Sequence, residues 1–298
     1  MVGLAAKLGA GFGGALLESD PTLESGVSWV IDLYNKLNIT VEAPTQFGSY
    51  HITVLVVVFI ATIALSYAFR NVGPSGMRLI AFAMWAIMLV GEVADKFVRC
   101  TTLVDGLLVF DYNWTKFPFQ LCDTGLWLLP LIILLPKGRI RDWVVVYMGL
   151  YSFFGGFLVC LLPYTVFNTS VISNMHMMTQ HGSQVVFGIA MLVNYRKKLT
   201  AGAYLGSSLV FLFVTGIAVA LNEVAYHFLQ AYGYTSKFTM FFLSPYFNSG
   251  QPVMGEIFEL VPWEIYLALY VVIFMLITLI IYGIAHIAIR IAKYCEEN

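Results

Sequence analysis

The chain has 298 residues, of which 59% are hydrophobic and only 11% are charged, and its formal net charge at pH 7 is −1. An ordinary soluble domain carries about 25% charged residues, so this composition, with a mean hydropathy of +0.81, excludes that class and indicates a membrane protein. The near-zero net charge and the lack of a basic block argue against nucleic acid as a partner.

The first 49 residues are expected to form a separate N-terminal segment at the membrane surface. Residues 1–17 are weakly apolar and interrupted by glycines, which favours an interfacial or re-entrant tail over a signal peptide. Between residues 24 and 38 the apolar side chains recur at helical spacing. This pattern predicts a short amphipathic helix that lies on the membrane.

Continuous apolar runs of about 20 residues follow, each long enough to cross the hydrocarbon core as a helix. Because these runs do not alternate between apolar and polar residues, helices are favoured over a barrel. We therefore predict an all-α fold, a polytopic bundle of about seven transmembrane helices that forms a single domain over residues 50–298. The spans are expected at residues 50–69, 79–98, 118–136, 143–163, 178–196, 202–227 and 263–289.

Two of the connections between these spans, residues 99–117 and 228–262, are long and rich in aromatic residues. The second is expected to cap a pocket, to enter the membrane interface or to hold a short extra helix.

The basic residues orient the predicted bundle. Ten of them follow the first, third, fifth and seventh spans, and by the positive-inside rule that side is cytoplasmic. The N-terminus is therefore expected outside and the C-terminus inside. The ten residues are Arg70, Arg78, Lys137, Arg139, Arg141, Arg196, Lys197, Lys198, Arg290 and Lys293.

With this topology, polar residues from several spans gather at one level, just below the outer surface. Ionisable groups in a bilayer are costly, so they are expected to face an interior cavity and to find partners there. Each also has a structural interpretation, as an ion pair, an interhelical hydrogen bond or an interfacial anchor. His176 is expected in solvent, in the loop before the fifth span. The grouped residues include His51, Glu92, Asp95, Cys122, His181, Asn222 and Glu223.

Cys122 and Asp123 stand where the loop segment FPFQ becomes an apolar helix, and Cys122 there lies near the positive end of the helix dipole. Together with His181 it suggests a nucleophile and base pair, in which the imidazole takes and later returns the thiol proton. Backbone N–H groups of the Cys122 turn would receive the oxyanion. The residues considered as supports, chiefly for orienting His181, are Asn222, Glu223, Glu92, Asp95 and His51.

Neither a metal nor another cofactor is expected. The four cysteines show no CxxC spacing, and the histidines form no HxxxH or HExxH motif. The sequence carries no signal for the oligomeric state.

Several stretches of the chain resemble the YwaF family of bacterial integral membrane proteins. They are QFGSYHITVL, GEVADKF, FPFQLCDTGLWLLPL, TQHGSQVVFG and ALNEVAY, within residues 45 to 285. That family is related to an animal transmembrane acyltransferase that remodels ether phospholipids, and more distantly to androgen-induced hydrolases of fatty-acid esters. The chain departs from the family pattern in ALNEVAY, where a glycine is expected before Asn222.

This resemblance implies a helical bundle with a catalytic pair at Cys122 and His181, which moves an acyl chain between a phospholipid and a lysophospholipid through a thioester. A lipid hydrolase of the same fold is the close alternative. A transporter or receptor with a polar outer cavity is a third hypothesis, although the lack of a sequence repeat argues against a carrier. An integral, multi-pass membrane location is expected, in the cell membrane if the protein is bacterial.

Overall fold

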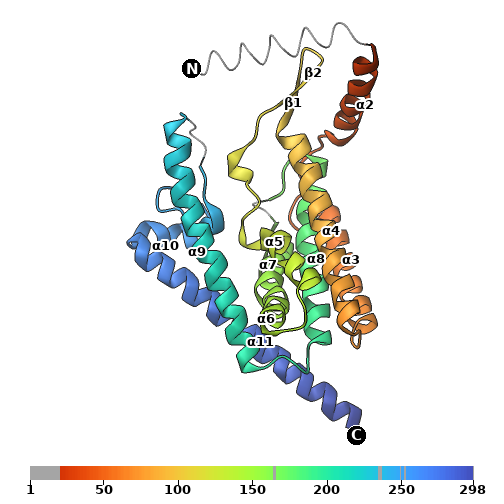
Figure 1. Ribbon diagram of the computed structural model, residues 1–298, viewed down its shortest axis with the longest axis vertical. Coiled ribbons are helices and arrows are strands. Elements are labelled where there is room, and N and C mark those ends of the chain that lie inside the picture. Colours follow the sequence, from red (N-terminus) through yellow and green to blue (C-terminus); the bar gives the residue numbers. More distant parts are fainter. Residues whose placement is uncertain (1–20, 164–165, 234–236, 249, 252, 298) are drawn as a thin grey trace.

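The computed structural model describes residues 21–163, 166–233, 237–248, 250–251 and 253–297. The expected tail at residues 1–17 lies outside the described residues. The described part is mostly helical, and its long helices alternate in direction between the two ends of the molecule (Figure 1).

Five helical segments are long and apolar enough to cross a membrane. This finding confirms the expectation of an integral, multi-pass membrane protein. The first two are α3 (Ser49–Ala68) and α4 (Pro74–Arg99). The third, Arg139–Leu161, joins α6 (Arg139–Tyr147), a π-helical turn (Met148–Ser152) and α7 (Phe153–Leu161). The last two are α9 (Ala201–Ala231) and α11 (Trp263–Glu297).

The predicted number of seven spans is not confirmed, because two of the seven do not meet this criterion. The segment expected at 118–136 is a short apolar helix over Leu121–Leu134, formed by the 3-10 turn η2 (Leu121–Asp123) and α5 (Thr124–Leu134). The segment expected at 178–196 belongs to α8 (Val171–Asn194), which carries many polar residues.

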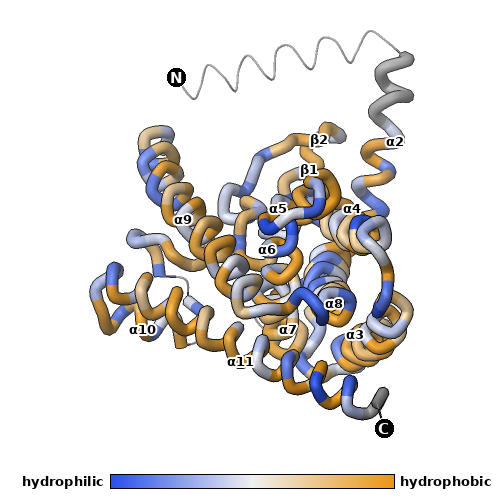
Figure 2. Tube along the Cα trace, turned by 60° about the horizontal axis from the view of Figure 1, so that its bottom comes forward, coloured by the Kyte–Doolittle hydropathy of each residue, from blue (hydrophilic) through white to orange (hydrophobic). Residues whose placement is uncertain are grey.

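Helix α8 lies inside the bundle, packed against α3, α4 and α7. Figure 2 shows hydrophilic stretches on α8 between hydrophobic neighbouring helices. Its polar side chains can therefore find hydrogen-bond partners in neighbouring parts of the protein, as Ser173, Gln180 and Gln184 do. Burial among these helices thus explains how α8 can carry more polar residues than the five apolar segments do.

Helix α8 begins earlier than expected, at Val171, because the Ser170 side chain accepts a hydrogen bond from the Ser173 backbone N–H and caps its first turn. The expectation that His176 lies in a solvated loop is therefore wrong. His176 lies within the helix and is buried, with 3% of its surface exposed.

The predicted helical fold is confirmed in its main part, but the described residues also contain a small β-hairpin that was not expected. Within the loop expected at 99–117, β1 (Thr101–Val104) and β2 (Leu107–Phe110) form an antiparallel hairpin. Asp105 and Gly106 connect the two strands with positive φ angles of 50° and 79°. A two-residue Asp-Gly turn between β-branched and apolar residues is a strong sequence signal for such a hairpin. The sequence TTLVDGLLVF carries it.

The expected amphipathic helix at 24–38 is α2 (Pro21–Leu37). It is tied to α4 and the hairpin, because Tyr34 packs edge-on against Phe97 and its hydroxyl donates a hydrogen bond to the Thr101 carbonyl. The long segment before α11 contains the 3-10 turn η5 (Met240–Phe242) and the short helix α10 (Met254–Leu260), which is the extra helix considered for this region.

The basic turns meet at one end of the bundle. The Asn194 side chain, at the end of α8, donates hydrogen bonds of 2.9 and 2.8 Å to the carbonyls of Phe69 and Val72 in the α3–α4 turn. Arg196 donates to Asn71 Oδ1 in the same turn, at 2.7 Å. The ends of α3 and α8 and the start of α4 are therefore fixed to one another.

Helices α6 and α9 are in close contact at Gly206. A Cβ atom at this position would lie only 2.1 Å from the Trp143 ring, whereas a Cβ at Gly216, on the same helix, would meet no atom within 4 Å. We expect Gly206→Ala to destabilise the protein by about 1–3 kcal/mol, because the indole must move away from a tightly packed site. Gly216→Ala serves as the matched control, and its better helix propensity leaves stability equal or higher. Fluorescence-detected thermal unfolding measures both, and equal midpoints would contradict the packing described.

Candidate functional site

The turn that carries Cys122 and Asp123 is closed on itself at the start of α5. The Asp123 backbone N–H donates to the Gln120 carbonyl, and Asp123 Oδ2 accepts from the Gln120 backbone N–H, both at 2.9 Å. These reciprocal bonds satisfy backbone groups that a helix start would leave unpaired. The side chain of Asp123 therefore shapes the turn on which the Cys122 thiol is placed.

Two glutamines of α8 hold this turn from the side. Gln180 Nε2 donates to Asp123 Oδ1 at 2.7 Å, and Gln184 Nε2 donates to the backbone carbonyl of Cys122. Both glutamines are buried, and their spacing of four residues puts them on one face of the helix. Helix α8 and the Cys122 turn are therefore positioned against each other by polar contacts at adjacent residues.

The Cys122 side chain differs from those of the other cysteines whose surroundings the structure describes. Cys122 is partly exposed, whereas Cys100 and Cys160 each retain only 2% exposure. Of these three residues, Cys122 therefore keeps the largest exposed fraction.

His181 directly follows Gln180 on α8 and is 2% exposed. Its Nδ1 lies 2.6 Å from the carbonyl oxygen of Met177. A carbonyl can only accept, so Nδ1 carries the proton and Nε2 holds a lone pair. Nε2 is buried and has no hydrogen-bond partner among the described residues. A neutral imidazole with a free Nε2 is the form that a general base requires.

The cysteine and the histidine are brought to the same level of the bundle through α8. Gln184 contacts residue 122, Gln180 contacts residue 123, and His181 lies between them in the sequence. In the described residues, no hydrogen bond joins the Cys122 thiol to Nε2.

Glu92 and Asp95 lie in an ionic cluster near the C-terminal end of α4. Glu92 pairs with Lys96 at 2.6 Å and with His176 Nε2 at 3.1 Å. Asp95 accepts a hydrogen bond from the Ser173 hydroxyl of α8. Both carboxylates are buried, and their contacts with α8 go to Ser173 and His176 rather than to His181.

His51 uses both ring nitrogens for structural contacts. Nδ1 accepts from the Phe47 backbone N–H at 2.9 Å, which leaves Nε2 to donate to the Cys160 carbonyl at 2.7 Å. The ring is fully buried. His51 thus connects the start of α3 to the end of α7.

Asn222 and Glu223 lie next to each other on α9 but have different surroundings. Asn222 is buried, and its amide exchanges two hydrogen bonds with the Met240 backbone, at 3.0 and 2.6 Å. Glu223 has a side chain that is 51% exposed, and it contacts His227 and Tyr246. Asn222 therefore fixes the segment around η5 against α9.

Among the described residues, no hydrogen bond or ion pair joins His181 to the residues considered for orienting it, Asn222, Glu223, Glu92 and Asp95. The atom that orients its ring is the carbonyl oxygen of Met177. Sequence reasoning also missed Gln180 and Gln184. The signal was present in TQHGSQ, where the two glutamines flank His181 at an interval of four residues.

Helix α7 approaches α8 closely at the candidate site. A Cβ on Gly156 would lie 2.7 Å from the His181 carbonyl oxygen and 2.6 Å from Gln184 Cβ. Only a glycine allows this approach. At metal-binding distance, the described part of the chain contains no group of three or more His, Cys, Asp or Glu side chains.

The partial exposure of Cys122 leads to a first test at this site. A small membrane-permeant maleimide should modify Cys122 before Cys100 and Cys160, because the latter two thiols are buried. Peptide mass spectrometry over a time course measures each site, and Cys122→Ser provides the control. Earlier modification of Cys100 or Cys160 would contradict the accessibility described.

A family model described as the TMEM164 family matches residues 46–282, which are 237 of the 298 residues. Among curated proteins and among solved structures, nothing matches the chain. The family match covers α3 to most of α11, including the Cys122 turn and α8. The chain belongs to the TMEM164 family.

Proposed function

We propose that this member of the TMEM164 family is a membrane lipid acyltransferase that uses Cys122 as nucleophile and His181 as general base and acid. One observation carries the proposal. The buried Nε2 of His181 has no hydrogen-bond partner in the described part of the chain, and His181 directly follows Gln180, one of the two glutamines of α8 that hold the Cys122 turn. A buried nitrogen without a hydrogen-bond partner lowers the free energy of unfolding, so its presence favours a functional explanation.

In the first half-reaction, His181 Nε2 takes the proton from the Cys122 thiol. The sulfur attacks the carbonyl carbon of a phospholipid acyl ester, and backbone N–H groups at the start of the helix receive the developing oxyanion. The ester C–O bond then breaks, and the leaving lysophospholipid oxygen takes the proton from Nε2. The products are a thioester on Cys122 and a lysophospholipid.

In the second half-reaction, the hydroxyl of an acceptor lysophospholipid gives its proton to His181 Nε2 and attacks the thioester carbonyl. The C–S bond breaks, and the thiolate recovers the proton. Catalytic hydrogen bonds are often long in a free enzyme and tighten when substrate binds. The thiol and Nε2 are therefore expected to come together with the lipid in place.

The supporting residues act at a distance from the reacting atoms in this proposal. Glu92 and Asp95 fix α4 against α8, and His51 joins α3 to α7, through the contacts described above. Asn222 positions the segment around Met240, to which the Gln120 side chain also bonds at the Thr239 carbonyl. Glu223 has an exposed side chain that contacts Tyr246, in the segment that follows η5.

We also propose that seven segments cross the membrane, with the N-terminus outside and the C-terminus inside. Helices α5 and α8 would complete the five apolar spans, α8 being shielded from lipid by α3, α4 and α7. The alternating helix directions in Figure 1 suit this arrangement. The basic turns that meet at one end would then lie on the cytoplasmic side.

A trapping experiment tests the chemistry. The purified protein in lipid is incubated with acyl-labelled phospholipid, quenched in acid and digested. We expect a hydroxylamine-labile acyl group on Cys122 in peptide mass spectrometry, and loss of turnover by at least about 100-fold in Cys122→Ala and His181→Ala.

Added lysophospholipid distinguishes the two enzymatic outcomes. For an acyltransferase, the labelled chain should appear on the added acceptor, whereas for a hydrolase it should appear as free fatty acid. Normal turnover in Cys122→Ala without an adduct would overturn the proposal. It would leave the transporter or receptor hypothesis.

Adjacent glycines of α7 give a second, geometric test. Gly156→Ala should lower turnover by about tenfold or more, because its Cβ would meet the backbone of His181, which no rotamer change can relieve. Gly155→Ala is the matched control, since its Cβ would have only a 3.9 Å neighbour, on Leu121. Thermal unfolding midpoints of both variants show whether the protein remains folded. Equal activity of the two variants would contradict a site built on the α7–α8 contact.

A further inference from the structure

A cavity of about 220 Å³ lies among the basic turns, far from the Cys122 turn. It is bounded by the start of α4, the α5–α6 connection, α6 and the end of α8. His181 and Asn194 are 13 residues apart on α8, so about 20 Å of helix separates the candidate active site from this cavity.

The cavity is strongly basic. Four cationic side chains line it, and no acidic side chain does. Asp142 contacts two residues of the cavity lining, because it pairs with Lys198 at 3.1 Å and accepts from the Tyr195 hydroxyl at 2.7 Å. The four cations are Lys137, Arg141, Lys197 and Lys198.

Arg141 distinguishes this cavity from a patch of exposed basic side chains, because its guanidinium is buried. Its side chain is 2% exposed, and Nη2 donates to the Pro74 carbonyl at 3.2 Å. Its Nε is buried and has no hydrogen-bond partner among the described residues. A guanidinium that is buried with an unused donor is costly, and an anion that accepts from it would remove that cost.

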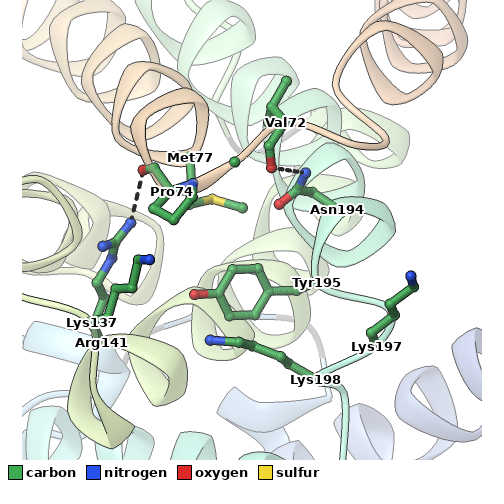
Figure 3. A pocket seen from close by; sticks show the side chains of 10 residues that line it. Val72, Pro74, Met77, Lys137, Arg141, Asn194, Tyr195, Lys197 and Lys198 are labelled. Carbon is green, nitrogen blue, oxygen red and sulfur yellow. Dashed lines mark hydrogen bonds between the residues drawn. The ribbon is translucent and has the colours of Figure 1, made fainter.

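Figure 3 shows how the side chains are arranged. Arg141 and Lys137 lie beside each other, with the Arg141 contact to Pro74 drawn as a dashed line, and the Tyr195 ring and Lys198 lie opposite them. The backbone at Gly73, before the first turn of α4, also lines the cavity, and a Cβ there would meet no atom within 4 Å. The positive end of α4 therefore adds to the cationic field.

We infer that this cavity is a binding site for a phosphate group, held by Arg141 with Lys137 and Lys197 at the rim. Arginine matches phosphate oxygens with two parallel donors, and lysines add charge. The volume is below the roughly 300–1,000 Å³ of pockets for drug-sized ligands, so it suits a headgroup rather than an acyl chain. Phosphate can arrive on an anionic phospholipid of the adjoining leaflet, as basic pockets between transmembrane helices allow, or on a soluble molecule.

Thermal unfolding of the full chain tests the site with two probes. In nanodiscs, phosphatidic acid replaces part of the phosphatidylcholine; in detergent, inorganic phosphate is titrated at constant ionic strength. We expect the unfolding midpoint to rise by about 3 °C or more with one or both probes. A rise with phosphatidic acid alone identifies a lipid headgroup, and a rise with inorganic phosphate identifies a soluble source.

Three variants make the result specific. Arg141→Gln should raise the half-saturating concentration at least about tenfold, since it removes a charged donor. Because Arg141 is buried and its loss can impair folding, Lys137→Gln combined with Lys197→Gln tests the exposed rim and should also weaken binding. Arg290→Gln, an exposed cation of α11 that does not line the cavity, should respond like the unmodified protein. No shift with either probe, or an equal shift in all variants, would overturn the inference.

Discussion

The structure depends on one constraint, that polar groups at membrane depth must find partners within the protein. Helix α8 meets this constraint by lying inside the bundle, where Ser173 contacts Asp95, His176 contacts Glu92, and Gln180 contacts Asp123. The first two contacts tie α4 to this helix, and the third ties the Cys122 turn to it. The polar sequence of α8 thereby determines how α4 and the Cys122 turn are placed around it.

The same helix connects the two sites that we propose. Its middle carries His181 and the glutamines that hold the Cys122 turn, whereas its end carries Asn194, which binds the α3–α4 turn beside the basic cavity. The two unsatisfied groups that support our proposals, His181 Nε2 and Arg141 Nε, belong to different helices, α8 and α6, and to different sites. Nε2 of His181 is an acceptor and can take a proton from a reacting group. Nε of Arg141 is a donor and can bind an anion.

Sequence reasoning identified the long apolar helices because continuous hydrophobicity is a local property that survives any packing. It missed the first turns of α8 because the polar residues Ser173, Asn174 and His176 resemble a loop when their partners are unknown. The hairpin was missed for a different reason. Its Asp105–Gly106 turn was readable in the sequence, but the surrounding apolar residues were taken as part of a connection.

The sequence by itself determined the membrane class, the apolar spans, the clustering of basic residues in particular turns, and the choice of Cys122 and His181 as chemically interesting residues. Only the tertiary structure decided which polar residues meet. It assigned His51 to a link between α3 and α7, Asn222 to the Met240 backbone, and the orientation of His181 to a carbonyl of its own helix. The physical reason is that hydropathy is a sum over neighbouring residues and can be read from a short stretch of sequence. A hydrogen bond between helices depends instead on distances that only the packing of distant segments sets.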